Sequence, residues 1–216
     1  VIELDAAAGQ MIRPAGCNSS ECAVAYEGGD VELDQLSVTF TMLEGLQWSD
    51  GTPLTAADSV YSFNLQADPD TPTVKNTIER TASYEAPDDI TIVWTGLPGY
   101  KDAIYFTNFY RPAPEHVWGQ YTAAELVEVV DAEGLYVGWG PYIIDEWVKG
   151  EYISLHKNPT YFRADEGLPK FETMIYRIVG ENSNANIAAI LSGECDIVDQ
   201  TSHLDAQSEL MLELQA

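Results

Sequence analysis

The chain has 216 residues, 45% of them hydrophobic, and its 35 acidic and ten basic residues give a net charge of −25. A chain of this length buries roughly 70% of its unfolded surface, which suffices for one large domain or two smaller ones. The charge would repel phosphate backbones and so excludes nucleic acid as a partner, and no apolar run is long enough to cross a bilayer. The acids are spread along the chain, which favours a solvated surface over a dedicated site for cationic ligands.

The first ten residues, VIELDAAAGQ, contain neither an initiator Met nor the basic and apolar regions of a signal peptide. We therefore expect the chain to be a segment of a longer protein.

Cys17 and Cys22 flank a polar Asn-Ser-Ser turn, a spacing that allows a small disulfide-closed loop. A metal site is the alternative, but it needs further ligands, and the three histidines are scattered along the sequence. We predict the disulfide, an oxidising compartment, and neither a metal nor another cofactor. Cys195 is expected to be a buried thiol in a strand.

The first half of the chain predicts two strands and two capped helices. Residues 36–43 alternate in strand-forming side chains, and residues 90–94 form a second apolar run. Thr55 with Asp58 three positions later is typical of a capping box, and it predicts a helix that continues to about Gln66 and packs through Val60 and Phe63.

A second capping box, Thr122 with Glu125, predicts a helix that ends at Gly134. A short helix is also predicted within residues 74–80.

The second half predicts a hairpin of residues 142–148 and 152–158, with Gly150 at its bend. A strand at 172–179, a helix from Ser183 to Gly193 and a strand from Cys195 would follow. Hairpins combined with a strand–helix–strand crossover indicate an α+β fold, a mixed β-sheet with flanking helices, without internal repeats.

Three segments resemble extracellular solute-binding protein family 5, which serves peptide and nickel uptake by ABC transporters. They are LSVTFTMLEGLQWSDGTPLTAADSVYSF (36–63), GWGPYIIDEWVKGEYISLHKNPTYF (138–162) and AAILSGECDI (188–197). Met42 and Leu43 stand where the family usually has a basic residue, and the general pattern lacks the Cys17–Cys22 insert. These departures leave the subfamily, and hence the ligand, open.

The resemblance implies an incomplete lobe of the periplasmic-binding-protein type II, peptide-binding fold. Residues 1–30 would be a lead-in with the disulfide loop, 31–120 the smaller subdomain of lobe I, 121–200 its main-sheet part, and 201–216 the start of a helix toward the second lobe. The implied function is capture of an oligopeptide or similar small solute in a two-lobe cleft. The full-length protein would serve ABC transporter membrane subunits outside the cytoplasm, in the periplasm or at the cell surface, with a lipid anchor as one option.

The resemblance also implies candidate ligand contacts. Gly138, Trp139 and Gly140 belong to a loop that faces the cleft in the family, where Trp139 could act as an aromatic platform; a core tryptophan is the alternative. A strand end facing the cleft would carry Thr107, Asn108 and Tyr110, with ordinary sheet packing as the alternative. Trp48 and Asp50 are expected to have structural roles in their turn.

Two other function classes remain as alternatives. A surface adhesion or structural domain would account for the strands and the disulfide, but not for the three family segments. A hydrolase could use acid pairs such as Asp145 with Glu146, but neighbouring residues on a strand point to opposite faces. The sequence contains no motif of a serine hydrolase, a phosphate-binding loop or a zinc protease, so we expect no enzyme.

Overall fold

The computed structural model describes residues 6–132, 134–179 and 183–199. The chain divides into two compact units, which are described separately. Unit 1 contains Val1–Ile143 and Lys157–Lys170, and unit 2 contains Ile144–His156 and Phe171–Ala216.

The described residues of unit 1 form short strands, three α-helices and four 3-10 helices. In chain order its elements are η1 (Ala6–Ala8), β1 (Met11–Ile12), β2 (Val24–Ala25), β3 (Ser37–Thr41), α1 (Ala56–Ala67), η2 (Ile78–Arg80), β4 (Thr81–Glu85), β5 (Thr91–Gly96), η3 (Tyr105–Thr107), α2 (Glu115–Trp118), α3 (Ala123–Ala132) and η4 (Ala164–Glu166).

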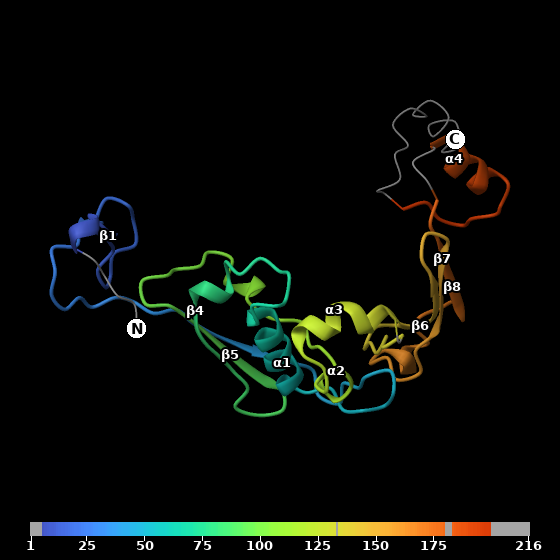
Figure 1. Ribbon diagram of the computed structural model, residues 1–216. Coiled ribbons are helices and arrows are strands. Elements are labelled where there is room, and N and C mark those ends of the chain that lie inside the picture. Colours follow the sequence, from blue (N-terminus) through green and yellow to red (C-terminus); the bar gives the residue numbers. More distant parts are fainter. Residues whose placement is uncertain (1–5, 133, 180–182, 200–216) are drawn as a thin grey trace. The chain divides into compact units, whose positions relative to one another are not determined.

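The main sheet of unit 1 is antiparallel and has the strand order β3-β5-β4. Burial alternates along the central strand β5, where Ile92 and Trp94 are fully covered. Helix α1 packs across this apolar face through Val60 and Phe63, as predicted (Figure 1).

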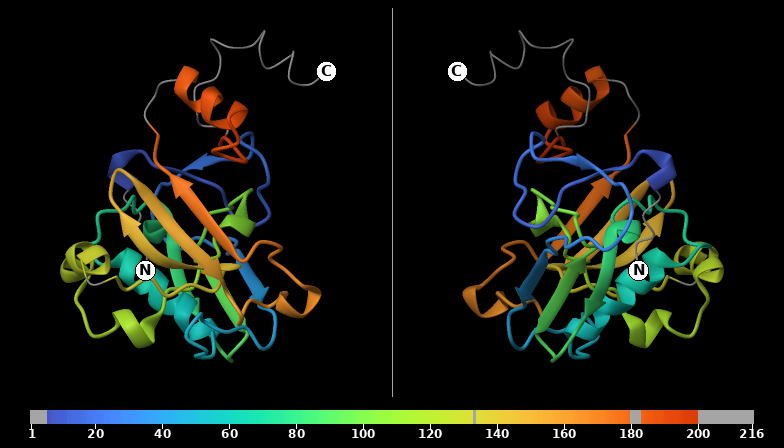
Figure 2. Two further views of the ribbon diagram at one scale, coloured as in Figure 1. Left: turned by 90° about the vertical axis from the view of Figure 1, so that its right-hand side faces the viewer. Right: turned by 90° about the vertical axis from the view of Figure 1, so that its left-hand side faces the viewer.

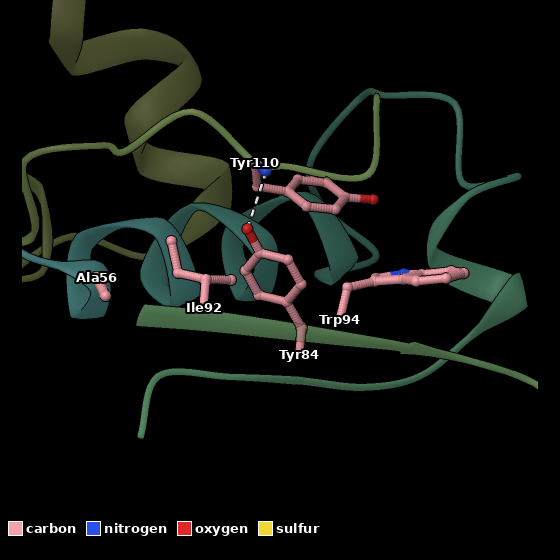
Figure 3. Packing of buried hydrophobic residues seen from close by; sticks show 5 residues of the cluster. All are labelled: Ala56, Tyr84, Ile92, Trp94 and Tyr110. Atoms are coloured by element: carbon pink, nitrogen blue, oxygen red, sulfur yellow. Dashed lines mark hydrogen bonds between the residues drawn. The ribbon is translucent and has the colours of Figure 1, made fainter. Parts of the chain in front are cut away.

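An aromatic cluster fills the space between α1, the sheet and the chain that follows η3 (Figure 3). Phe63 stacks on Tyr84 with ring centroids 4.9 Å apart, and Tyr84 meets Tyr110 edge-on at 5.2 Å. The Tyr84 hydroxyl accepts the Tyr110 backbone N–H at 2.9 Å and lies 2.8 Å from the Ser59 hydroxyl. Burial, with a smaller effect of Tyr84, raises the pKa of Tyr110 to about 12. This phenol therefore stays neutral at physiological pH.

Both predicted capping boxes are present. Thr55 and Asp58 cap α1, and the Asp58 carboxylate accepts the Thr55 backbone N–H at 2.9 Å. At α3 the Glu125 carboxylate accepts the Thr122 N–H at 2.8 Å, while the Thr122 hydroxyl accepts the Glu125 N–H at 3.3 Å. Gly134 follows α3 with a positive φ of 65°, which a glycine adopts without steric cost.

The predicted disulfide joins Cys17 and Cys22. Beside it, the Lys101 ammonium donates to the Asp34 carboxylate at 2.7 Å, to the Asn18 side chain at 3.0 Å and to the Cys17 carbonyl at 3.2 Å. The hydrogen bond from Lys101 holds the pKa of Asp34 below its ordinary value. One cation thus ties the disulfide loop to the chain around residues 34 and 101.

Unit 2 contains the predicted hairpin and the predicted strand after it. Its elements are β6 (Tyr142–Val148, which begins in unit 1), β7 (Tyr152–Lys157), β8 (Thr173–Arg177) and α4 (Ser183–Leu191). The strand order is β6-β7-β8, with β7 and β8 antiparallel. Figure 2 shows the hairpin strands in gold with the orange β8 beside them.

Outside the candidate site, three local predictions are wrong. Residues 195–199 form no strand, so the expected strand–helix–strand crossover is absent from the described residues. Cys195 is partly exposed and not buried. Only Ile78–Arg80 of the predicted helix at 74–80 is helical, as a 3-10 turn. The helix expected at 201–216 lies outside the described residues, and the α+β class is confirmed.

Candidate ligand-binding site

The Trp-Ser-Asp-Gly turn anchors the region of the candidate site. Trp48 is only 1% exposed, and its indole N–H donates to the buried carboxylate of Asp58 at 3.3 Å. The Asp50 carboxylate accepts the Thr52 backbone N–H at 2.9 Å, and Gly51 has a φ of +85°. These contacts give Trp48 and Asp50 the structural roles that the sequence predicts.

The same turn holds one side of the predicted cleft loop, residues 138–140. The Ser49 backbone N–H donates to the Gly138 carbonyl at 2.7 Å, and the Gly138 N–H donates to the Ser49 hydroxyl at 3.3 Å. These reciprocal hydrogen bonds join two segments that lie far apart in the sequence but belong to the same family resemblance.

The Asn-Pro-Thr-Tyr segment holds the other side of the loop. Asn158 is fully buried, and its side-chain amide donates to the Gly140 carbonyl at 2.7 Å. The Thr160 hydroxyl donates to the Trp48 carbonyl at 3.0 Å, so this segment also reaches the Trp-Ser-Asp-Gly turn. The cleft loop is therefore fixed at both glycines.

Trp139, between these glycines, is half-buried, and its role as a ligand contact stays a prediction. Within the described part of the chain, neither its main chain nor its indole N–H makes a hydrogen bond. A Cβ atom added at Gly138 or Gly140 would meet nothing within 4 Å, and neither residue has a positive φ. The space beside both glycines is therefore open.

Trp139 lines an apolar hollow of about 290 Å³ in unit 1. None of the lining residues is charged, and the polar side-chain groups among them are the Thr41 hydroxyl and the Trp139 indole N–H. Phe40 and Phe109 meet edge-on in this lining, with centroids 5.6 Å apart. The lining residues are Phe40, Thr41, Met42, Leu43, Leu46, Leu54, Phe109, Pro112, Trp139 and Phe162.

The strand expected to carry Thr107, Asn108 and Tyr110 is absent, because this part of the chain forms η3 and an irregular exit. Asn108 is 2% exposed, with its amide donating to the Asp102 carboxylate at 2.9 Å, and Tyr110 belongs to the aromatic core. Thr107 is exposed, and its hydroxyl donates to the Ile104 carbonyl at 2.9 Å. Their role as ligand contacts stays a prediction, and the burial of Asn108 and Tyr110 favours the packing alternative.

A hydrogen-bonded histidine and carboxylate lie next to the anchoring turn. The His116 Nε2 atom is 2.7 Å from the Asp50 carboxylate, and the His116 ring lies 6.0 Å from that of Trp48. Partial burial acts to raise the pKa of Asp50, but hydrogen bonds from the Thr52 backbone and from His116 outweigh it. The pKa of Asp50 therefore lies below its ordinary value.

Most residues that line the hollow were not predicted from the sequence. Phe40 and Met42 lie on one face of a correctly predicted strand, but Phe109 and Phe162 come from irregular segments that periodicity does not describe. In residues 6–132, 134–179 and 183–199, no cluster of His, Cys, Asp and Glu is arranged to hold a metal ion. The helices in those ranges lack the length and apolarity of a membrane span.

Comparison with known proteins places these features in a family. The chain is 29% identical to the oligopeptide-binding protein AppA of Bacillus subtilis over 168 residues, covering 76% of the chain and 30% of AppA. It is 33% identical to Protein XP55 of Streptomyces lividans, covering 76% of the chain and 28% of XP55. The chain thus spans about 30% of the length of these relatives.

Solved structures show the same fold. The oligopeptide-binding protein OppAIV of Borrelia burgdorferi superposes with a TM-score of 0.67 at 22% identity, covering 86% of this chain and 39% of that one. AppA, solved with a nonapeptide, gives a TM-score of 0.63 at 23% identity over 85% of this chain and 36% of AppA. The model of the bacterial extracellular solute-binding proteins, family 5 Middle, matches residues 21–213. The chain therefore belongs to the bacterial extracellular solute-binding proteins, family 5.

Proposed function

We propose that the full-length protein containing this chain is an extracytoplasmic receptor of an ABC importer that captures oligopeptides and catalyses no reaction. The observation that carries the proposal is the cleft loop beside the apolar hollow. Ser49, from another family segment, holds the loop at Gly138, and Asn158, from the loop's own segment, holds it at Gly140. A loop that is held by hydrogen bonds and carries an aromatic residue without a hydrogen bond of its own suits ligand binding. The loop supplies neither a nucleophile nor a base.

The proposed domain layout follows the family resemblance. Residues 1–30 are the lead-in, 31–120 the smaller subdomain of lobe I, 121–200 its main-sheet part, and 201–216 lead toward a second lobe. The membrane subunits of the importer are the partners of the full-length protein. Fractionation of the source cells tests the location: the receptor should be found in the periplasm or at the cell surface, and with the membrane if a lipid anchors it.

Peptide is the ligand class that the site supports best. AppA was solved with a nonapeptide, and the lining here offers little polar side-chain chemistry beyond Thr41. A sugar would need several polar side chains in addition to an aromatic platform.

Thermal denaturation of the full-length protein with peptide and oligosaccharide libraries tests the function. Peptides should raise the melting temperature as mass action requires, and Gly140→Ala should reduce that rise while leaving the ligand-free melting temperature unchanged. The second expectation follows from the free space around Gly140. The proposal is abandoned if no peptide raises the melting temperature, and release of cleavage products would point to a hydrolase.

The 216-residue chain alone should bind such a peptide far more weakly than the full-length protein. Two-lobe receptors bury the ligand between surfaces from both lobes, and one surface alone lacks the opposing contacts and the exclusion of water. Calorimetry of both proteins with the same peptide measures the difference. Equal affinities would place the whole site within this chain and contradict the two-lobe account.

A further inference from the structure

We propose that Asn18 is a modification site and carries an N-linked oligosaccharide. The inference rests on the proposed extracytoplasmic location of the full-length protein. It concerns a part of unit 1 that is separate from the candidate ligand-binding site, because none of residues 17–22 lines the apolar hollow.

Two segments of the sequence have the pattern of an N-glycosylation acceptor, in which a serine or threonine follows an asparagine after one intervening residue. They are residues 18–20, Asn-Ser-Ser, and residues 158–160, Asn-Pro-Thr. Proline excludes the second segment, because Pro159 fixes its own φ and restricts the backbone of Asn158. Asn158 is in addition fully buried, and its amide already donates to the cleft loop at 2.7 Å. Asn18 is therefore the one candidate acceptor in the sequence.

The acceptor segment lies at the surface of a loop that the disulfide closes. Residues 13–23 connect β1 and β2 without a helix or a strand, and the Cys17–Cys22 disulfide encloses the acceptor segment. Residues 18–20 are all exposed, whereas Cys17 beside them is buried. A bulky sugar on Asn18 would therefore extend into solvent and leave the core intact, as N-linked glycans on surface loops do.

The two polar atoms of the Asn18 side chain have different surroundings. Its Oδ1 atom accepts a hydrogen bond from the Lys101 ammonium at 3.0 Å, which orients the amide. Its Nδ2 atom, which would carry the sugar, makes no hydrogen bond within the described residues. Glycosylation replaces one of the two N–H groups and keeps Oδ1 as an acceptor, so the sugar and the contact with Lys101 are compatible.

The two hydroxyls of the acceptor segment also differ. The Ser19 hydroxyl accepts the Glu21 backbone N–H at 3.3 Å, whereas in the described part of the chain the Ser20 hydroxyl makes no hydrogen bond. The acceptor pattern requires a hydroxyl at the position of Ser20 and accepts any residue except proline at the position of Ser19. The hydroxyl that the pattern requires is thus the one that is free.

The sugar donor belongs to one chemical class, an oligosaccharide linked through phosphate to a membrane lipid. The Asn18 Nδ2 atom attacks the anomeric carbon, so a C–N bond forms while the bond from that carbon to the phosphate oxygen breaks. The lipid phosphate leaves with the bonding electrons, and one proton of Nδ2 passes to a base of the transferring enzyme. The reaction needs no oxidant or reductant.

The test uses full-length protein recovered from the periplasm or surface of the source cells. Cleavage after glutamate releases residues 4–21 as one peptide with Asn18 inside it. Mass spectrometry of this peptide, after reduction and alkylation, should find the mass of the sugar localised on Asn18. An unmodified or deamidated Asn18 would overturn the inference and leave the proposed function intact. Full-length protein that is found only in the cytoplasm would contradict both.

Matched variants expressed in the same cells test the acceptor pattern. Asn18→Gln and Ser20→Ala should each abolish the added mass, whereas Ser19→Ala and Ser20→Thr, which keep the pattern, should retain it. Sugar that persists in Asn18→Gln would lie on another residue, and sugar that persists in Ser20→Ala would show that the Ser20 hydroxyl is not recognised. Either result would overturn the inference.

Discussion

At the scale of single residues, Asp58 links the anchoring turn to helix α1. Asp58 is 7% exposed, and its carboxylate accepts two hydrogen bonds, one from the Thr55 backbone and one from the Trp48 indole. Without the carboxylate, the N–H of a nearly fully buried tryptophan would have no acceptor. Asp58 therefore has more influence on stability than an ordinary helix cap.

We expect Asp58→Ala to lower the free energy of unfolding by about 2–4 kcal/mol, because it removes the cap and leaves the Trp48 N–H unpaired. Thr55→Ala, which keeps the carboxylate, should cost about 1 kcal/mol. Glu125→Ala at the exposed cap of α3 is the control and should cost less than Asp58→Ala. Urea denaturation measures all three, and equal losses for Asp58→Ala and Glu125→Ala would contradict the linking role.

Asp50 should make stability depend on pH in the acid range. Its pKa is lower in the folded than in the unfolded chain, so its contribution is fully present above about pH 4 and is lost as pH falls through the lowered pKa. The difference in free energy of unfolding between the natural protein and Asp50→Asn should therefore shrink below about pH 4. A difference that stays constant down to about pH 2 would rule out this contribution.

At the scale of elements, α1, β4 and the chain after η3 share one buried hydrogen-bond network. The Ser59 hydroxyl donates its proton to the Tyr110 carbonyl, so the Tyr84 hydroxyl must donate to Ser59. The Tyr84 oxygen in turn accepts the Tyr110 N–H, which is the bond drawn in Figure 3. This network orients the segment that continues into Phe109 and Pro112 of the hollow.

Tyr84→Phe removes one oxygen atom from this network and should cost about 1–3 kcal/mol, because it leaves the buried Tyr110 N–H unpaired. Tyr176→Phe in β8 makes the same chemical change at a residue that is 55% exposed, and it should cost close to nothing. Denaturant midpoints of the two variants give the comparison. Equal effects would mean that the network does not stabilise the fold.

Elements with strong local patterns were predicted, whereas elements fixed by tertiary contacts were not. Capping boxes located α1 and α3, and alternation with Gly150 located the hairpin. Around η3 the aromatic run resembles a strand, but Asp102 caps a turn there by accepting the Ile104 backbone N–H and the Asn108 amide. Hydrophobic periodicity does not reveal a turn that is held by hydrogen bonds from one short polar side chain to a residue six positions away.

The ligand-contact roles assigned to the candidate site stay predictions. The family resemblance pointed to Trp139 and its glycines, and the structure shows open space beside the glycines and a loop fixed in place. The convergence of Ser49, Asn158 and Thr160 on this loop depends on how separate segments pack, which one sequence does not show.

At the scale of the whole molecule, the acidic surface is largely uncompensated. The chain has ten basic residues against 35 acids, and several of these bases are already engaged in local contacts. Lys101 binds Asp34, Arg163 binds Glu166, and Lys75 donates to the carbonyl oxygens of Asp68 and Thr71 after α1. The remaining acids repel one another, and this repulsion destabilises the compact state.

Added NaCl should therefore stabilise the protein. Raising the salt concentration from about 0.01 M to about 1 M shortens the screening length from about 30 Å to about 3 Å. We expect the melting temperature to rise by at least about 2 °C, the shift that about 1 kcal/mol produces in a chain of this size. The rise should diminish near pH 4, where many carboxylates are protonated. A melting temperature that falls or stays constant with salt at neutral pH would show that surface repulsion has little effect.

The hydrogen bonds that fix the cleft loop also bear on the order of events during folding. Thr160 lies 112 positions from its acceptor residue Trp48, and Gly138 lies 89 positions from Ser49. Contacts across such separations require large loops to close, whereas the capped helices form from neighbouring residues. Trp139 should thus reach its final position late in refolding, and the nascent protein would pass through a period in which its helices are formed but it cannot yet hold a ligand.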